Sequence, residues 1–285
     1  MKRLMLLVLA LCLLTPLAAH AEEAGWNDPP QGFDTRREGV TYGKTVFKSY
    51  LSRTTKTFRN LLVILPPDYS EEKTYPVLYL LHGIGGDHNE WSHGVPDVVI
   101  GNLIADGLAP EMIVVMPNVR ARVNDAANPS DVYSVEHFAA FDNFINDLTN
   151  DLMPFMQENF AVAQDRENTA VAGLSMGGRE ALYIGLSKPE LFGYVGAFCP
   201  APGVLPYHAE KGLFQKADFK AAEGLDSYIL INAGQWDGVV GEWPSTYAAT
   251  LTENGTENTF YVMPGGHDFT VWKHGLYNFA QRIFD

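Results

Sequence analysis

From residue 77 to the C-terminus, short apolar runs alternate with longer amphipathic segments, and this alternation constrains the fold more than any other feature. The runs, each too brief for a helix, are 77–81, 112–116, 169–172, 194–199, 228–231 and 259–263. The segments with a helical pattern are 98–106, 139–159, 178–187, 245–253 and 269–283. Near-continuous apolar strands that alternate with helices predict an α/β fold with a mainly parallel central sheet and helices on both faces. The 3.6-residue period is most sustained over 139–159, where we expect one continuous helix.

A different pattern precedes this alternation. Between Gly39 and Leu65, apolar and polar residues alternate on either side of a turn, which predicts antiparallel N-terminal strands at one edge of the sheet. Two later connections, 120–137 and 200–225, are longer than simple α/β turns require. Both begin at the carboxyl ends of predicted strands, where open α/β sheets bind their ligands. We therefore expect them to form the walls of a pocket.

The first residues have the pattern of a secretory signal peptide. A basic start is followed by the apolar run 4–14 and then by Ala19-His20-Ala21, a cleavage-site pattern. The run is too short to span a bilayer. We therefore expect a signal peptide at 1–21, a single α/β domain at 22–285, no membrane-spanning segment, and a secreted or periplasmic protein.

The composition limits the partners and cofactors. The chain carries 34 acidic and 20 basic residues, a formal net charge of −14, which argues against binding to nucleic acid or to anionic membranes. Cys199 is the one cysteine outside the signal segment and lies in an apolar run, so we expect a core residue and no internal disulfide. The sequence has no H-E-x-x-H, no paired cysteines and no Asp-rich calcium loop, so we expect no metal and no cofactor.

One motif between a predicted strand and a predicted helix points to catalysis. The segment Gly173-Leu174-Ser175-Met176-Gly177-Gly178 fits the pattern G-x-S-x-G. A sharp turn at this place exposes the hydroxyl of Ser175, and only small neighbours let the chain double back so closely. The adjoining amides would lie at a helix N-terminus, where the partial positive charge favours an oxyanion. The alternative is a glycine-rich turn whose serine caps the helix.

A serine nucleophile needs a base, and the base needs an acid that fixes its tautomer. After a G-x-S-x-G turn these partners follow in the order acid, then histidine, on loops after later strands. Asp237 and His267 each follow one of the last two predicted strands. We predict Ser175 as nucleophile, Asp237 as acid and His267 as base. Asp226 precedes its strand and Glu242 lies further along the loop, so both are weaker candidates for the acid.

Two backbone N–H groups should stabilise the developing oxyanion. One is expected from Met176, the residue after the nucleophile. The other is expected from the loop His82-Gly83-Ile84-Gly85-Gly86-Asp87, whose glycines let the backbone approach the substrate, with Ile84 as the candidate donor. This loop lacks the G-K-[ST] and G-x-G-x-x-G patterns of phosphate-binding loops.

Three segments together resemble a known family. Leu78–Gly86, Gly173–Gly178 and Gly265–Phe269 with Trp272 are similar to the esterase-D-like α/β-hydrolases, and within them to carbohydrate esterase family 1, the feruloyl and acetylxylan esterases. The similarity runs from about Thr57 to the C-terminus. It implies an α/β-hydrolase fold, no metal or organic cofactor, and hydrolysis of esters on plant polysaccharide.

The resemblance also implies roles for individual residues. It gives the nucleophile, acid, base and oxyanion roles to the residues named above. Asn118 matches a pocket-side position of such enzymes, and Trp91 matches a common aromatic after the oxyanion loop, for which packing is the alternative. The same family pattern includes S-formylglutathione hydrolases, mycolyl transferases and siderophore esterases, and the secretion signal counts against the first of these.

Aromatic residues crowd the loops expected at the pocket mouth. They are Trp91, Tyr133, Phe138, Tyr207, Trp236 and Trp272. Flat aromatic walls favour a flat aromatic acyl group. The resemblance implies an acylated carbohydrate or small ester as substrate, and the aromatic residues favour hydroxycinnamoyl (feruloyl) esters over acetate, with Trp236 among the substrate-binding residues. An acetylxylan or other acyl-carbohydrate esterase is the first alternative. A non-catalytic binding protein would need a triad member to be missing.

Overall fold

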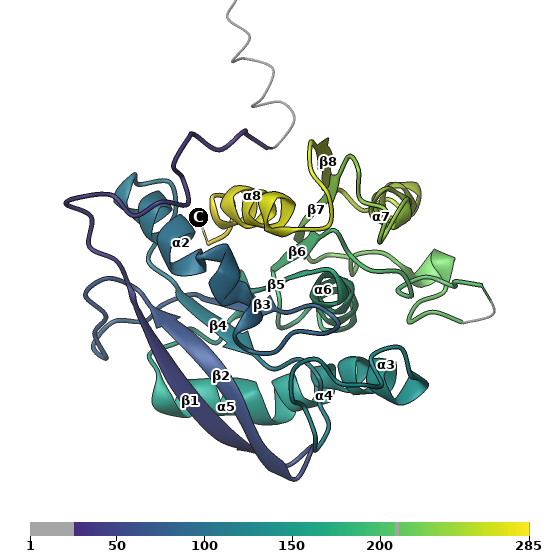
Figure 1. Cartoon of the computed structure of the whole chain (residues 1–285), viewed down its shortest axis with the longest axis horizontal. Coiled ribbons are helices and arrows are strands. Elements are labelled where there is room, and N and C mark those ends of the chain that lie inside the picture. The colour runs from purple at the N-terminus through teal and green to yellow at the C-terminus, as the bar shows by residue number, and fades with distance from the viewer. Residues whose placement is uncertain (1–25, 209–210, 285) are drawn as a thin grey trace, which may run out of the picture.

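An eight-stranded sheet lies at the centre of the structure, in the order β1-β2-β4-β3-β5-β6-β7-β8 (Figure 1). The strands are β1 (Lys44–Ser52), β2 (Thr57–Leu65), β3 (Val77–Leu81), β4 (Ile113–Pro117), β5 (Thr169–Leu174), β6 (Tyr194–Phe198), β7 (Tyr228–Gly234) and β8 (Thr259–Met263). Strands β3 to β8 are parallel, whereas β2 is antiparallel to both β1 and β4. The mainly parallel sheet with antiparallel N-terminal strands is thus confirmed.

This computed structural model describes residues 26–208 and 211–284. The signal peptide expected at 1–21 therefore lies outside the described residues. Among the helices of the described segments, none combines the length and the apolar character that crossing a bilayer requires.

Helices cover both faces of the sheet (Figure 1). Helices α2 (Pro96–Ala105) and α8 (Phe269–Ala280) pack on one face, and α3 (Val135–Asp142), α4 (Phe144–Asp147), α5 (Met153–Asn159), α6 (Met176–Ser187) and α7 (Trp243–Glu253) pack on the other. Each layer encloses its own apolar core, so β3, β4 and β5 are buried along their whole length. Burial on both faces explains why these strands are apolar throughout instead of alternating.

The prediction of one continuous helix at 139–159 is wrong, because the structure divides this segment into shorter helices. Between α4 and α5 lies a wider π turn, Leu148–Leu152, in which the N–H of Met153 donates to the carbonyl of Leu148. Pro154 follows at once and has no N–H, so it cannot continue the regular hydrogen-bond pattern of an α-helix. The apolar stripe still faces the core: Phe144, Leu148 and Met156 are fully buried. Burial of one face produced the helical period, and the proline accounts for the interruption.

A buried arginine fixes the start of the first long connection. Arg59, on β2, is fully buried and pairs with the equally buried Asp147 at 3.0 Å. Its guanidinium also donates to the backbone carbonyls of Asn118 and Arg120, directly after β4. The energetic cost of burying this guanidinium is offset, because a carboxylate and several carbonyls replace its lost hydration. The chain therefore leaves the sheet in a defined direction at the end where the expected site lies.

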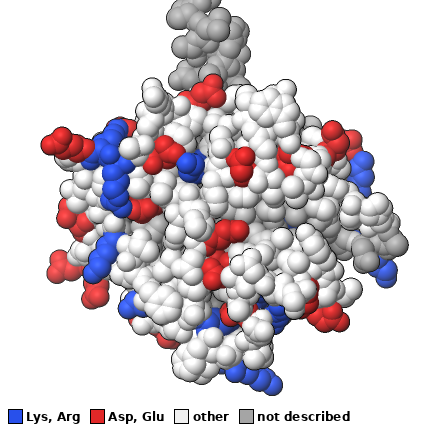
Figure 2. Space-filling view, in the orientation of Figure 1, with Lys and Arg blue, Asp and Glu red and all other residues white. Residues whose placement is uncertain are grey.

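The charge distribution agrees with an acidic protein. On the face seen in Figure 2, red acidic side chains are dispersed and the blue basic ones form no continuous patch. The mixed charges on that face accord with a chain in which acidic residues outnumber basic ones.

Candidate active site

Ser175 lies in the turn between β5 and α6 and has a strained backbone. Its φ of 53° and ψ of −116° fall in a region that residues with a Cβ rarely adopt. Glycines make the turn possible: a Cβ on Gly177 would lie 2.3 Å from the carbonyl oxygen of Leu81, and one on Gly173 would lie 2.5 Å from the backbone of Gly177. The side chain of Ser175 makes no capping hydrogen bond to α6, which excludes the helix-capping alternative.

The structure brings the three predicted side chains into one hydrogen-bonded chain. The Oγ of Ser175 lies 2.9 Å from Nε2 of His267, and Nδ1 of His267 lies 2.7 Å from Oδ2 of Asp237. Asp237 follows β7, and His267 lies between β8 and α8. The other carboxylate oxygen, Oδ1, accepts the N–H groups of Val239 and Val240 at 2.9 and 3.2 Å. In this arrangement an imidazole can take the serine proton while the carboxylate holds the ring.

The electrostatic setting keeps Asp237 ionised. Its burial acts to raise its pKa, but the hydrogen bond and charge of His267, with the two backbone amides, outweigh burial and lower the pKa below its ordinary value. A carboxylate that stays charged can stabilise the imidazolium formed when the serine loses its proton. Glu242, the neighbouring alternative acid, instead lies at the N-terminus of α7, where its backbone carbonyl accepts from the Ser245 hydroxyl.

Both predicted oxyanion donors border the nucleophile. Met176 is the first residue of α6, so its N–H has no acceptor within the helix. Ile84 lies in the loop after β3, and a Cβ on the preceding Gly83 would lie 3.5 Å from Cβ of Ser175. Within the described segments the N–H of Ile84 has no backbone acceptor. Both amides are therefore free to donate to a substrate oxygen.

Two predicted substrate-binding residues, Trp91 and Asn118, are buried. Trp91 is 1% exposed, packs edge-on against Phe198 and Phe269, and donates its indole N–H to the carbonyl of Leu81 at 2.8 Å. Its contacts match the packing alternative and contradict the pocket role.

Asn118 is 3% exposed, and both ends of its amide group are hydrogen-bonded within the protein. Its side-chain nitrogen donates to the carbonyl of Asp125 at 2.6 Å. Its side-chain oxygen accepts the N–H of Arg120 at 3.2 Å. Asn118 therefore holds the loop after β4 together, and its expected contact with substrate is not supported.

Three of the six mouth aromatics remain accessible. Tyr133, Trp236 and Tyr207 are 81%, 69% and 37% exposed. Trp272 instead packs its ring edge-to-face against the imidazole of His267. The sequence reasoning missed exposed aliphatic side chains on the same loops, namely Val123, Val135 and Val239. Their position in the loops after β4 and β7 was the signal that could have identified them.

One group of three potential metal ligands occurs in the described part of the chain. Ligand atoms of Cys199, Asp237 and His267 lie within 4.8 Å of one another. Two of the three are already hydrogen-bonded to each other, and burial, followed by the charge of Asp237, raises the pKa of the Cys199 thiol. A neutral thiol is a poor metal ligand. The chemistry of this donor set favours the hydrogen-bonded triad over a metal centre.

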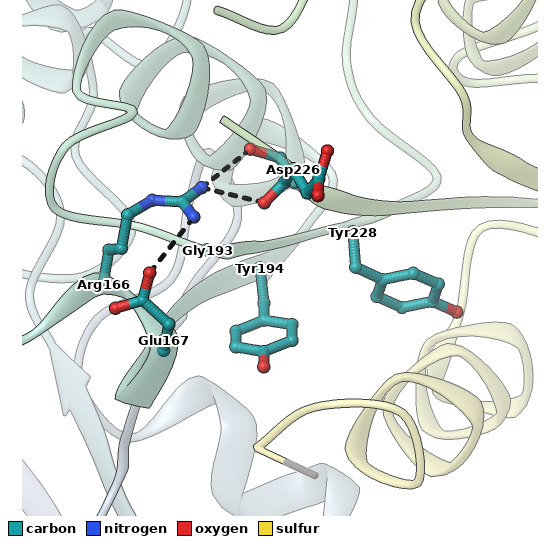
Figure 3. A pocket seen from close by; sticks show the side chains of 7 residues that line it. Arg166, Glu167, Gly193, Tyr194, Asp226 and Tyr228 are labelled. Carbon is teal, nitrogen blue, oxygen red and sulfur yellow. Dashed lines mark hydrogen bonds and ion pairs between the residues drawn. The ribbon is translucent and has the colours of Figure 1, made fainter. Parts of the chain in front are cut away.

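A separate hollow of about 360 Å³ lies at the opposite end of the sheet (Figure 3). It is lined at the starts of β6 and β7 by Arg166, Glu167, Gly193, Tyr194, Asp226, Ser227 and Tyr228. The guanidinium of Arg166 is held by the backbone oxygen of Asp226 and the hydroxyl of Ser227. Asp226, the other alternative acid, therefore lies far from Ser175.

The chain is similar to known esterases over most of its length. A model of the Esterase family matches residues 52–283. An endo-1,4-beta-xylanase/feruloyl esterase of Xylanibacter ruminicola is 30% identical over 261 residues, 89% of this chain but 33% of that protein, so the chain spans about a third of its length. An acetyl esterase of Caldicellulosiruptor saccharolyticus is 26% identical over 246 residues, 82% of this chain and 85% of that one. A CE1 ferulic acid esterase of Anaeromyces mucronatus, solved in complex with ferulic acid, is 39% identical with a TM-score of 0.85, covering 90% of this chain and 96% of that one.

Proposed function

The chain belongs to the Esterase family, and on this basis we propose that it is a serine carboxylic-ester hydrolase. Ser175 is the nucleophile, His267 the general base and Asp237 the acid that orients the ring. The N–H groups of Ile84 and Met176 stabilise the oxyanion. The observation that carries the proposal is the chain of hydrogen bonds from the serine hydroxyl to the aspartate, at 2.9 and 2.7 Å.

The proposed reaction has two halves joined by an acyl-enzyme. Oγ of Ser175 attacks the ester carbonyl while Nε2 of His267 takes its proton. The tetrahedral oxyanion collapses, and the imidazolium returns that proton to the leaving alcohol. A water molecule then gives a proton to His267 and attacks the acyl carbonyl, and the serine leaves with the proton restored. Every proton in this sequence moves between substrate, water and these two side chains.

We propose a hydroxycinnamoyl group, such as feruloyl, on plant cell-wall carbohydrate as the preferred acyl group. The Anaeromyces mucronatus relative holds ferulic acid, and the Xylanibacter ruminicola relative is a xylanase/feruloyl esterase. The exposed rings of Trp236 and Tyr133 support this choice, because flat aromatic faces stack well against a cinnamoyl ring.

The substrate proposal is tested by comparing kcat/KM for methyl ferulate and for methyl acetate, which share a leaving group. We expect methyl ferulate to be preferred. We also expect Trp236→Ala to lower kcat/KM for methyl ferulate by about 2- to 10-fold, the equivalent of one aromatic stacking contact, and to leave methyl acetate unaffected. A ratio well above ten in favour of acetate would overturn the feruloyl assignment.

An acetyl-carbohydrate esterase is the second candidate. The Caldicellulosiruptor saccharolyticus acetyl esterase favours it, because the alignment covers most of both chains. Release of acetate from acetylated xylan, without release of ferulate from feruloylated xylan, would select this candidate.

We also propose that the enzyme is exported to the periplasm or the medium as a single domain. The support is the signal-peptide pattern of residues 1–21, which lie outside the described residues. Sequencing of the mature N-terminus from an exporting host is expected to begin at Glu22. A mature protein that retains Met1 would contradict the export proposal and leave the esterase proposal untouched.

A further inference from the structure

The loop that carries Ile84 is held by its carbonyl groups. The carbonyl of Ile84 accepts from Nε2 of His137 at 2.9 Å, that of Gly85 from the N–H of Asn128 at 2.9 Å, and that of Gly86 from the guanidinium of Arg120. All three donors belong to the first long connection and the first turn of α3. The segment after β4 therefore fixes the oxyanion loop through three consecutive carbonyl groups.

Two histidines hold the peptide groups on either side of Ile84. Nε2 of His82 accepts the N–H of Val119 at 2.8 Å, so its other nitrogen, Nδ1, carries the hydrogen and donates to the carbonyl of Gly83 at 2.7 Å. His137 holds the carbonyl on the following side. With both flanking peptide planes fixed, the direction of the Ile84 N–H is fixed as well.

His137 makes this contact through a single side-chain bond. Its ring is fully buried, and Nδ1 is buried without a partner. Because a carbonyl oxygen can only accept, Nε2 must carry the hydrogen, which leaves a lone pair at Nδ1 of the neutral ring. Protonation would bury an unpaired N–H. Burial lowers the pKa of His137 accordingly, and the nearby Arg120 and Arg122 lower it further.

We propose that His137 is a positioning residue for ester hydrolysis, which holds the Ile84 carbonyl so that the Ile84 N–H points at the oxyanion. The inference rests on the proposed esterase function. The ring contacts neither the nucleophile nor its base, so its effect passes entirely through the loop. An oxyanion donor acts in the transition state and not on the bound ester, so a misaligned donor should lower kcat and leave KM nearly constant.

The experiment compares variants of similar bulk that differ in hydrogen-bonding ability. His137→Leu fills the space without a donor, whereas His137→Gln keeps an N–H at a similar reach. Ser134→Ala is the matched control, because the Ser134 hydroxyl accepts the backbone N–H of His137 at 3.0 Å and caps the same turn of α3 without touching Ile84. Urea unfolding checks that every variant is folded.

The readouts are kcat and KM for p-nitrophenyl acetate and the inhibition constant of a trifluoromethyl ketone, which becomes a tetrahedral oxyanion on Ser175. Loss of an oxyanion donor costs about 10²- to 10³-fold in kcat, and we expect misalignment in His137→Leu to cost about 10-fold or more. KM should stay within about twofold, and ketone affinity should fall in parallel with kcat. His137→Gln should recover most of kcat, and Ser134→Ala should match the wild type.

Several results would overturn the positioning role. A folded His137→Leu variant with wild-type kcat would show that His137 does not position the Ile84 N–H. Equal losses in the Leu and Gln variants, or an equal loss in Ser134→Ala, would show that His137 supports only the packing of α3. An active wild type with any of these results refutes the inference alone. A wild type that hydrolyses no ester refutes the proposed function, and the positioning role with it.

Discussion

Ser175→Gly should give a more stable protein than Ser175→Ala, although both variants lack the nucleophilic hydroxyl. The backbone of Ser175 has a φ of 53° and a ψ of −116°, which glycine adopts without steric conflict. Alanine retains the Cβ and therefore the conflict. Because neither variant can hydrogen-bond to His267, the difference between them reports the backbone strain, reduced by the greater freedom of glycine in the unfolded chain.

The magnitude follows from two opposing terms. Holding a residue with a Cβ in a sparsely populated backbone region costs about 1–3 kcal/mol. Because the ψ of Ser175 is far from the left-handed helical region, we expect a cost in the upper part of this range, about 2–3 kcal/mol. Glycine opposes this gain, since its unfolded chain has more freedom to lose, by about 0.4–1 kcal/mol. The free energy of unfolding of Ser175→Gly should therefore exceed that of Ser175→Ala by about 1–2.5 kcal/mol.

Urea unfolding followed by tryptophan fluorescence measures the difference. Ser187, the last residue of α6, supplies a matched control in an ordinary helical conformation. There the order should reverse, with Ser187→Gly less stable than Ser187→Ala by up to about 1 kcal/mol. If the Ser187 pair behaves in this way and Ser175→Gly is no more stable than Ser175→Ala, the turn stores no strain and our reading of it is wrong.

Further predictions follow from the same contacts. Asp237→Asn should lower kcat/KM about 10³-fold and Glu242→Gln by less than about twofold, measured on p-nitrophenyl acetate; the reverse order would reassign the acid. Gly177→Ala should destabilise the protein by about 1–3 kcal/mol in urea, because its Cβ would meet two backbone oxygens within 2.6 Å. Burial raises the pKa of Glu180 from 4.5 to about 7, so folding favours its protonated form, and this contribution disappears as pH rises through that range. Relative to Glu180→Gln, the free energy of unfolding of the wild type should fall by up to about 3 kcal/mol between pH 5 and 8. A difference between the two proteins that stays constant with pH would contradict the raised pKa.

The sequence could predict the sheet and the triad because each depends on a strong local pattern. Burial of the strands on both faces required unbroken apolar runs, and the order of strands placed Ser175, Asp237 and His267 at the same edge. The helix at 139–159 could not be predicted as observed. Its apolar period depends on burial of one face, which a π turn preserves, so the period alone could not reveal the interruption at Leu148–Leu152.

The residues that contact the substrate were the least predictable part of the site. Trp91 and Asn118 follow strands that end at the site, as a ligand-binding residue would. Their side chains are nevertheless hydrogen-bonded to backbone carbonyls within the protein, those of Leu81 and Asp125, instead of facing a ligand. Sequence position identifies the edge of the sheet on which a residue lies, but the direction of its side chain depends on partners that are distant in sequence. The same reason explains why the sequence analysis did not single out His137, whose contact with the Ile84 carbonyl joins residues distant in sequence.

The account depends on Ser175 being the activated nucleophile, and covalent labelling tests this most directly. The folded protein is treated with a fluorophosphonate, digested, and analysed by peptide mass spectrometry. We predict one phosphonylated residue, Ser175, with labelling abolished in Ser175→Ala and strongly slowed in His267→Ala, because the reagent requires an activated serine. Labelling of another residue, or a Ser175→Ala variant that still hydrolyses p-nitrophenyl acetate at the wild-type rate, would contradict the proposed mechanism.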